Sequence, residues 1–379
     1  MMPVRCPLAV TLAVLVGASL TACSTATSTP SSQETTSPQP QDPIAVAGTV
    51  WVANEEGNSL TVIDAATTRV VTTLTGIESP HNVQAGRDGS ITYSVSGHDN
   101  TVLAIDAATY AVAAIEPSGP SPAHVIDSAD GAKVYATNAG DGTVSVFSGP
   151  GLEPLSTIST GGMPHGLRPA ADGSVIVVAN TEAGTVDLID PATDVETVAV
   201  PVGGSPVQVA VDADGRYAYA SITEPASVVK VDLDSGEVVA SVDVSAPPVQ
   251  LFLTPDGRTL VSADQGTETK PGDTLSVIDT TTMEVRSTIR TGSGPHGVVI
   301  DPSGTRAWVT NIYDDTVSVV DLPNLSVLAT VTVGDMPNGV SFSSESPATP
   351  PSSTIRLEVP TTAGMPDAHD ESMSMPSES

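Results

Sequence analysis

Cysteine is nearly absent from this chain, which has only Cys6 and Cys23 among 379 residues. Cys6 lies in an N-terminal apolar stretch that we expect to be removed, so the mature chain would keep one cysteine. An intrachain disulfide is then impossible, and a cysteine framework of the kind found in small secreted domains is excluded. Packing alone has to stabilise the fold.

Basic and aromatic residues are also scarce. Thirteen Lys and Arg stand against 44 Asp and Glu, the net charge is −31, and aromatic residues make up 3% of the chain. Binding to nucleic acid or to anionic lipid headgroups requires the opposite charge. Binding of single strands also requires a basic groove with exposed aromatics. We expect no nucleic-acid partner, and we interpret the acidity as that of a soluble protein at a cell surface.

Familiar catalytic motifs are missing from the sequence. It contains no Gly-x-Ser-x-Gly, no His-Glu-x-x-His, no phosphate-binding loop and no dinucleotide fingerprint. No motif therefore assigns a catalytic residue.

The N-terminus predicts export. An apolar run from Pro7 to Leu20 follows Arg5, a length that fits a signal peptide and is short for a membrane span. Leu20-Thr21-Ala22-Cys23 resembles a bacterial lipobox, which implies lipidation at Cys23; an ordinary secretory signal is the alternative. We expect residues 1–23 to be a lipoprotein signal and residues 24–44, rich in Ser, Thr and Pro, to be a disordered tether. The protein would then be extracytoplasmic and held to the bacterial cell membrane by its lipid anchor alone.

A repeated unit fills the remainder of the chain. A proline recurs at steps of 42, 42, 42, 42, 47 and 42 residues, at Pro80, Pro122, Pro164, Pro206, Pro248, Pro295 and Pro337. A fixed period of this size indicates one supersecondary unit that is copied and stacked.

Each unit contains four short strands, here named A to D. The copy that begins at Pro206 shows them as Val207–Val211, Tyr217–Ser221, Val228–Val231 and Val238–Val242, with a turn at Asp214-Gly215. Alternating apolar residues and tight turns, with no helical period, predict an all-β seven-bladed propeller over residues 45–344 with four antiparallel strands per blade. We expect it to be a monomer.

Closure of the ring is predicted from the two ends of the repeat region. The first copy starts at strand B with Thr49–Asn54, and the last supplies an extra strand A, Gly339–Ser343. We expect this C-terminal strand to complete the first blade as its innermost strand, with Ile44–Ala47 as a weaker competitor. Residues 345–379 are predicted to be a disordered acidic tail, although Thr354–Val359 alternates and could add an edge strand.

Several of these segments resemble a known repeat. Trp308-Val309-Thr310-Asn311, Tyr135-Ala136-Thr137-Asn138 and Trp51-Val52-Ala53-Asn54 are similar to the Tyr-Val-Thr-Asn signature of YVTN-repeat β-propellers. The resemblance covers roughly residues 45–344 and implies the same fold. It implies no single function, because that family has many roles. Related propellers include lactonases and virginiamycin B lyase, which use His and Glu with a divalent metal, but no motif here matches theirs residue by residue.

Histidines gather where chemistry is expected. Strand direction places the D–A and B–C loops on one face of the ring, and His81, His165 and His296 each follow a repeat proline there. Because they fall on three well-spaced blades, these three could hold a divalent metal such as Zn²⁺ or Cu²⁺ at the axis. As a candidate ligand-binding set we take His81, His98, His124, His165, His296 and Asn338. The alternative is that Pro-His-Gly is ordinary repeat sequence, with each histidine bonded to a neighbouring loop.

Two other features lie outside this histidine set. The B–C loops carry acids such as Glu55 and Asp99, and one copy has a five-residue insertion between Asp264 and Asp273 on the same face. His369, Met373 and Met375 in the tail form a weaker copper candidate. The sequence thus favours a surface-tethered binding module for a protein partner or small ligand, without enzymatic activity. A metal-dependent lactonase or lyase is the alternative.

Overall fold

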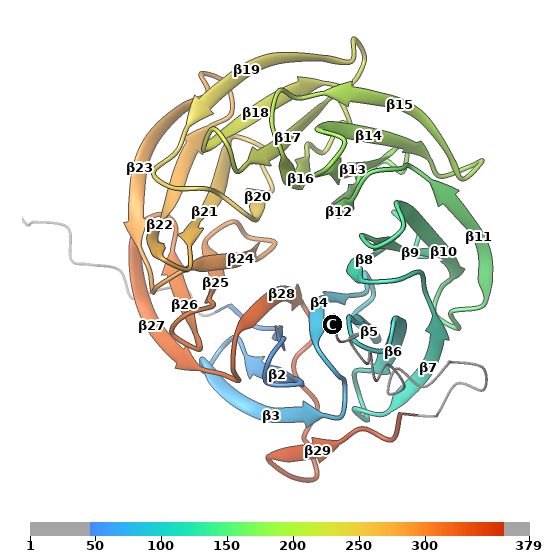
Figure 1. Cartoon of the computed structure of the whole chain (residues 1–379). Helices are drawn as coiled ribbons and strands as arrows, with labels where there is room; N and C mark the ends of the chain where they lie inside the picture. The colour runs from blue at the N-terminus through green and yellow to red at the C-terminus, as the bar shows by residue number, and fades with distance from the viewer. Residues whose placement is uncertain (1–45, 360–379) are drawn as a thin grey trace, which may run out of the picture. The chain divides into compact units, whose positions relative to one another are not determined.

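The structure, a computed structural model, describes residues 46–359, in which seven antiparallel sheets surround a central axis (Figure 1). Blade 1 is β28 (Pro337–Ser343), β1 (Thr49–Asn54), β2 (Ser59–Asp64) and β3 (Arg69–Thr75). Blade 2 is β4 (Pro80–Ala85), β5 (Ile91–Ser96), β6 (Thr101–Asp106) and β7 (Val112–Pro117). Blade 3 is β8 (Pro122–Asp127), β9 (Lys133–Asn138), β10 (Thr143–Ser148) and β11 (Pro154–Ser159).

The other four blades repeat this order from the axis outward. Blade 4 is β12 (Pro164–Pro169), β13 (Ile176–Asn180), β14 (Thr185–Asp190) and β15 (Val195–Pro201). Blade 5 is β16 (Pro206–Val211), β17 (Tyr217–Ile222), β18 (Ser227–Asp232) and β19 (Glu237–Asp243). Blade 6 is β20 (Leu251–Leu253), β21 (Thr259–Thr267), β22 (Lys270–Asp279) and β23 (Glu284–Arg290). Blade 7 is β24 (Pro295–Ile300), β25 (Arg306–Asn311), β26 (Thr316–Asp321) and β27 (Ser326–Thr332). The seven-bladed, four-stranded prediction is confirmed. Within residues 46–359 no helix is long and apolar enough to cross a membrane.

The ring closes as predicted. β28 pairs antiparallel with β1, with Phe342 opposite Val50. The Phe342 ring also stacks on Trp308 of blade 7, with 5.1 Å between ring centroids. In the competing segment, Val46 and Ala47 belong to no strand; Ile44 and Ala45 lie outside the described residues. β28, from the end of the repeat region, is therefore the innermost strand of blade 1 and connects the last blade to the first.

Large side chains in strand B join neighbouring blades. Trp51 packs with Val83 and Leu103 of blade 2, and Trp308 packs with Val50 and Val52 of blade 1. Both indoles are almost fully buried. The strand-B position of Trp51 and Trp308 is thus a blade-to-blade contact, as expected for aromatic residues with large buried areas.

The asparagine that ends strand B has a defined structural role. Asn311 Nδ2 donates to the hydroxyls of Thr316 and Ser318 in strand C, while its Oδ1 accepts from the Gly292 amide in the D–A loop. Asn138 makes the same three contacts in blade 3. One buried amide at the end of strand B thereby hydrogen-bonds to strand C and to the D–A loop. This explains why the signature ends in Asn.

Residues beyond Ser344 do not all behave as a tail. β29 (Thr354–Arg356) pairs in parallel with β3, and Leu357 is buried against the core of blades 1 and 2. The expectation of a disordered segment is therefore wrong for residues 345–359, because an apolar residue there finds a core to pack against, and the edge-strand alternative is confirmed. Residues 360–379, with His369, Met373 and Met375, lie outside the described residues, as do the predicted signal, Cys23 and tether.

Candidate functional site

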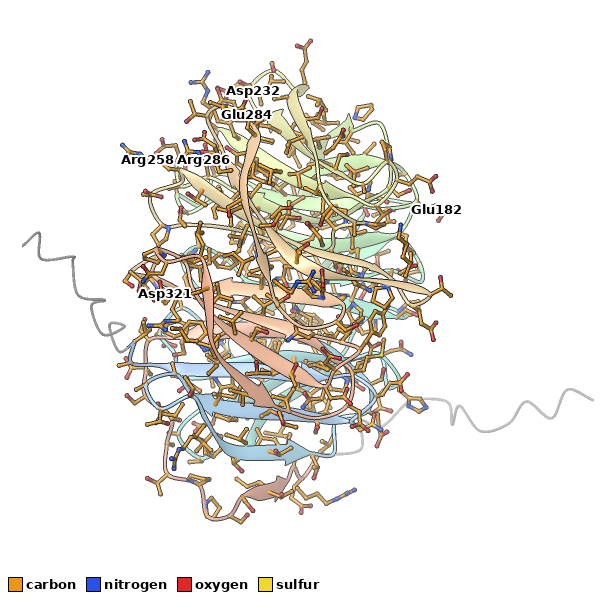
Figure 2. All side chains as sticks on the ribbon, turned by 90° about the vertical axis from the view of Figure 1, so that its left-hand side faces the viewer. Glu182, Asp232, Arg258, Glu284, Arg286 and Asp321 are labelled. Carbon is orange, nitrogen blue, oxygen red and sulfur yellow. The ribbon has the colours of Figure 1, made fainter. Side chains whose placement is uncertain are left out.

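The two faces of the ring differ in which loops they carry. In a side view, Arg258 of an A–B turn and Asp321 of a C–D turn lie at one edge, and Glu182 of a B–C loop lies at the other (Figure 2). Six of the seven repeat prolines begin the innermost strands on the Glu182 side, and in blade 6 the inner strand β20 starts at Leu251, after Pro248. The histidines that follow them are therefore at the channel mouth of the D–A/B–C face, as expected.

A β-bulge near the start of the inner strand sets which side chains reach the axis. Between Pro122 and Val125 the strand advances three residues while its partner advances two, and the same shift occurs after Pro80 and Pro164. A bulge turns successive side chains toward the same side, which regular alternation would not allow. Both residues after the proline can therefore reach the axis.

Three imidazoles meet there. The ring centroids of His81 and His165 are 5.3 Å apart, those of His124 and His165 are 4.8 Å apart, and those of His81 and His124 are 5.7 Å apart. One nitrogen from each of these rings lies within 4.8 Å of the others. The three-ligand group thus differs from the expected set: His124, one residue later in its copy, takes the place of His296.

Hydrogen bonds indicate which nitrogen of two histidines at the mouth carries the proton, His165 and His296. Nδ1 of His165 is 3.0 Å from the carbonyl oxygen of Val207, and Nδ1 of His296 is 3.2 Å from that of Asn338. Nδ1 of His81 is 3.3 Å from Glu55 Oε2. Carbonyl oxygens only accept, so Nδ1 of His165 and of His296 donates and their Nε2 keeps its lone pair. Nδ1 of His81 has two neighbours: the Glu55 carboxylate favours the same tautomer, whereas the Asn338 amide nitrogen, at 3.1 Å, favours the opposite one. Metal-binding histidines are oriented in this way.

Several polar atoms at the mouth have no partner. Among the described residues, His81 Nε2, Asn338 Oδ1 and Gln250 Nε2 are buried without a hydrogen bond. Asn338 Nδ2 donates to Glu55 Oε2, the oxygen that also accepts from His81. Unpaired buried polar atoms are costly, and a bound ligand or ion that contacts them would remove that cost.

The second position after the proline carries a layer of buried amides that the sequence analysis missed. Gln208 Nε2 lies 3.5 Å from His124 Nδ1, and its Oε1 accepts from the Val209 amide. This arrangement favours the opposite tautomer for His124, with the proton on Nε2. At the same position in blade 4, a Cβ on Gly166 would overlap the Gln208 side chain, so the glycine of Pro-His-Gly makes room for a neighbour.

Burial favours the neutral form of three histidines at the mouth, His124, His165 and His296. It lowers the pKa of His165 to about 3 and that of His296 to about 4, with the charge of His81 acting in the same direction. Burial, followed by the charges of His165 and His81, places the pKa of His124 well below its usual value. Burial alone would raise the pKa of Glu55, but hydrogen bonds and charge from His81, with the Asn338 bond, lower it to about 2. At neutral pH His124, His165 and His296 are thus neutral and Glu55 is a carboxylate; neutral imidazole is the form that binds metals.

These shifts predict acid sensitivity. Between pH 6.5 and 5 the unfolded chain binds protons at His124, His165 and His296 that the folded chain does not, so the free energy of unfolding falls as the pH falls. Each histidine contributes roughly 1.4 kcal/mol per pH unit. Urea unfolding at several pH values should show this slope, and His165→Gln should reduce it by about one proton. An unchanged slope in that variant would contradict a neutral His165.

The other expected site residues are placed differently. His98 is exposed and bonded to Asp99 at 3.0 Å, so it does not join the cluster. Among the B–C loop acids within residues 46–359, only Glu55 is hydrogen-bonded to a histidine of the cluster, His81. The insertion in blade 6 lengthens the hairpin of β21 and β22, where Gly266 pairs with Pro271.

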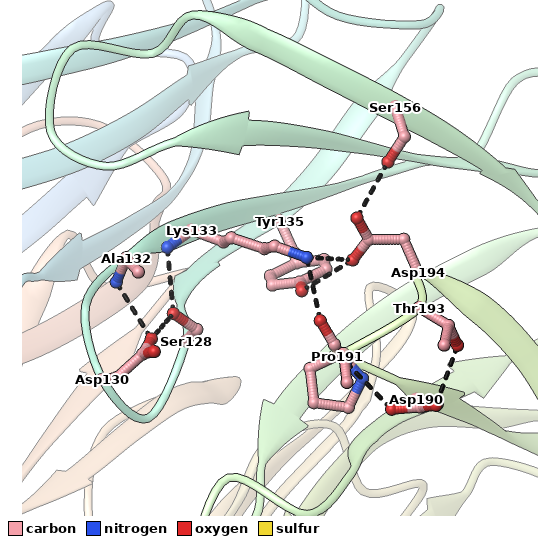
Figure 3. Close-up of polar contacts among 11 residues, drawn as sticks. Ser128, Asp130, Ala132, Lys133, Tyr135, Ser156, Asp190, Pro191, Thr193 and Asp194 are labelled. Carbon is pink, nitrogen blue, oxygen red and sulfur yellow. Dashed lines mark hydrogen bonds and ion pairs between the residues drawn. The ribbon is translucent and has the colours of Figure 1, made fainter.

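A cavity of about 510 Å³ lies on the opposite face, between blades 3 and 4. Lys133 Nζ donates there to Asp194 Oδ1 at 2.7 Å and to the Pro191 carbonyl at 2.8 Å, and Tyr135 donates to the same carboxylate at 3.1 Å (Figure 3). Burial and the Asp194 charge raise the pKa of Tyr135, so it stays a donor. Because its polar groups are already paired, this cluster joins two blades and offers little to a ligand.

Comparisons with known proteins agree with the fold. A family model described as YNCE-like beta-propeller matches residues 85–257. No curated protein matches the chain. Hydrazine synthase from Kuenenia stuttgartiensis is similar in structure, with a TM-score of 0.64 and 20% identity, over 70% of this chain and 90% of that one.

Two further solved structures are comparable. A protein of unknown function from Desulfotomaculum acetoxidans has a TM-score of 0.67 and 14% identity over 78% of this chain and 99% of that one. A candidate 6-phosphogluconolactonase from Bacteroides uniformis has a TM-score of 0.65 and 18% identity, again over 78% and 99%. At these identities the likeness shows the fold alone, and one fold serves many functions.

Proposed function

We propose that this chain, whose repeats, seven blades and family match fit a YVTN-type β-propeller, is a binding module that holds one divalent transition metal at its channel mouth. His81 and His165 bind through Nε2, and His124 supplies the third imidazole. Zn²⁺ and Cu²⁺ are the candidates, because neutral imidazole suits both. The bound ion, with positions left open, would then contact the small ligand or protein partner on the D–A/B–C face.

One observation carries this proposal: three imidazoles converge at the mouth, and Nδ1 of His165 is held by the Val207 carbonyl, which leaves its Nε2 free. The ligand nitrogens lie within 4.8 Å of each other. Around zinc they would be about 3.3 Å apart, from Zn–N bonds of about 2.0–2.1 Å. The rings therefore need to close by an ångström or more, a movement that side-chain rotation in the open mouth can supply.

Glu55 orients His81 in this account. Since its pKa is about 2, it is a weak proton acceptor at neutral pH and poorly matched to general-base catalysis. This favours binding over the alternative of a metal-dependent lactonase or lyase. That alternative requires turnover, and metal-loaded protein that opens a lactone such as 6-phosphogluconolactone faster than the metal-free protein would support it.

The cellular setting is also part of the proposal. Lipidation at Cys23 would hold the propeller outside the bacterial cell membrane, with residues 24–44 as the tether and the lipid as the only membrane contact. The charge of −31 supports a partner other than nucleic acid. Release of the protein from membranes by detergent, and loss of membrane association in Cys23→Ala, would test the anchor.

Metal loading tests the binding function. Chelator-treated protein, incubated with Zn²⁺ or Cu²⁺ and desalted, should retain one ion per chain by elemental analysis. Retention of no ion, or of several ions with no preferred stoichiometry, would contradict a built site.

Gln208 offers a sharper test through His124. In Gln208→Glu, one carboxylate oxygen keeps the Val209 amide and the other accepts a proton from His124 Nδ1, which frees Nε2 for the metal. Supporting groups of this kind are worth about 10–100-fold in metal affinity. We expect Zn²⁺ affinity to rise about tenfold in a competition titration with a chelator.

The matched control is Gln84→Glu, which adds the same charge on an inner strand where the amide bonds the Ala85 carbonyl. If Zn²⁺ affinity rises equally in Gln208→Glu and Gln84→Glu, the added charge alone explains the effect and His124 is not a ligand.

A further inference from the structure

Arg168 is a cation without a carboxylate partner. It lies on the inner strand β12, and its Nη1 donates to the carbonyl of Leu167 at 2.9 Å. No ion pair involving Arg168 is formed within residues 46–359, although the chain has 44 acids for 13 bases. In so acidic a protein, an unpaired and partly buried guanidinium is unexpected, since burial of a charge is costly unless it is paired.

The side chain borders a cavity of about 230 Å³ at the inner edge of blades 4, 5 and 6, on the A–B turn side. The lining contains no carboxylate; it consists of Arg168, Pro169, Ala171, Ala210, Val211, Ala213, Leu251, Phe252, Leu253, Thr254, Pro255 and Gly257. At about 30 Å³ per water, the space corresponds to roughly eight water molecules. It is large enough for a small organic anion.

Nearby acids are engaged in their own turns. Asp172 accepts from the Ser174 amide, Asp212 from the amides of Arg216 and Tyr217, and Asp256 from Arg258 and Thr254. These bonds to local amides hold the carboxylates at the turns, so they do not neutralise Arg168. Burial lowers the pKa of Arg168 to about 10, which leaves it charged at neutral pH.

We infer that this cavity is a binding site for a small oxyanion, whose carboxylate or phosphate group pairs with Arg168. A guanidinium binds such groups through two parallel hydrogen bonds. Leu251, Phe252 and Leu253 supply an apolar wall from β20, which suits a short carbon chain on the anion. The cavity opens on the A–B turn side and the metal site lies at the D–A/B–C mouth, but Arg168 is close enough for its charge to act on His124.

Calorimetric titration of the metal-free protein at constant ionic strength tests this inference. Inorganic phosphate and butanoate serve as probes, with acetate for comparison. We expect saturable binding of one anion per chain, tighter for butanoate than for acetate if the apolar wall contributes. Arg168→Gln should weaken binding at least tenfold, whereas Arg69→Gln, an equal charge change on the same face in blade 1, should leave it unchanged.

A second variant keeps the inference testable if Arg168→Gln fails to fold. Ala213 is exposed and lines the cavity, so Ala213→Glu should fold normally and still weaken the anion by repulsion. Absence of saturable binding for all three anions, or equal binding by wild type and Arg168→Gln, would overturn the inference. Zn²⁺ titration of wild type and the same variants keeps the two proposals apart, because absence of anion binding by wild type with Zn²⁺ binding retained overturns this inference alone. Arg168→Gln should bind Zn²⁺ somewhat more tightly, since it removes a positive charge that acts on His124.

Discussion

His165→Ala is expected to lose at least 100-fold in Zn²⁺ affinity. This residue supplies an Nε2 whose availability is fixed by the bond from Nδ1 to the Val207 carbonyl, and its ring contacts both other imidazoles. Removal leaves two imidazoles, and a two-ligand site binds metal weakly. A competition titration with a chromogenic chelator measures the change.

His98→Ala is the matched control, since this exposed histidine lies outside the cluster. The fold should persist in both variants, because blade packing does not depend on the mouth. Equal affinity in His165→Ala and wild type, with both folded by circular dichroism, would show that the metal binds elsewhere, and the acidic B–C loops would be the first place to look.

Truncation after Glu345 is the second change with a large expected effect. It removes β29 and Leu357, together with the bonds from the Thr73 amide to Ser353, from the Leu357 amide to Thr75 and from the Tyr110 hydroxyl to Ala348. Burial of one leucine is worth about 1.5–3 kcal/mol, and each hydrogen bond adds about 0.5–1.5 kcal/mol. The ordering of the segment offsets part of this sum.

We therefore expect the free energy of unfolding to drop by about 2–4 kcal/mol and Tm to fall by several degrees. Removal of residues 360–379 alone is the matched control and should leave Tm unchanged. If the two truncations unfold at the same temperature, the segment from 345 to 359 does not stabilise the ring.

The sequence predicted the ring well because the period is a property of the whole chain. Seven prolines at regular steps fixed the number of blades, and the missing strand A in the first copy located the closure at Phe342. The edge strand near Leu357 was harder to predict, since a three-residue strand resembles an ordinary polar tail until its apolar neighbours on blades 1 and 2 are known.

The site was predicted less completely, and the β-bulge is the reason. Regular alternation directs only the first residue after each proline to the axis, which selects His81, His165 and His296. The shift in register also brings in the second residue, and with it His124 and Gln208. A bulge depends on backbone register, and no residue type in these copies marks it plainly.

Glu55 could have been found from the repeats. It directly follows the last residue of strand B, and the equivalent positions are Gly97, Ala139, Thr181, Thr223, Gln265 and Ile312. Glu55 is thus the only acid at its position among the seven copies. A position-by-position comparison of the copies distinguishes Glu55 from the other acids of the B–C loops.

Anomalous diffraction from crystals of the zinc- or copper-loaded protein tests the central claim most directly. We predict one strong peak per chain at the channel mouth, about 2.0–2.1 Å from Nε2 of His81 and of His165, with the His124 ring turned toward it. A peak among the carboxylates of the outer loops, or no peak in fully loaded protein, would contradict the account.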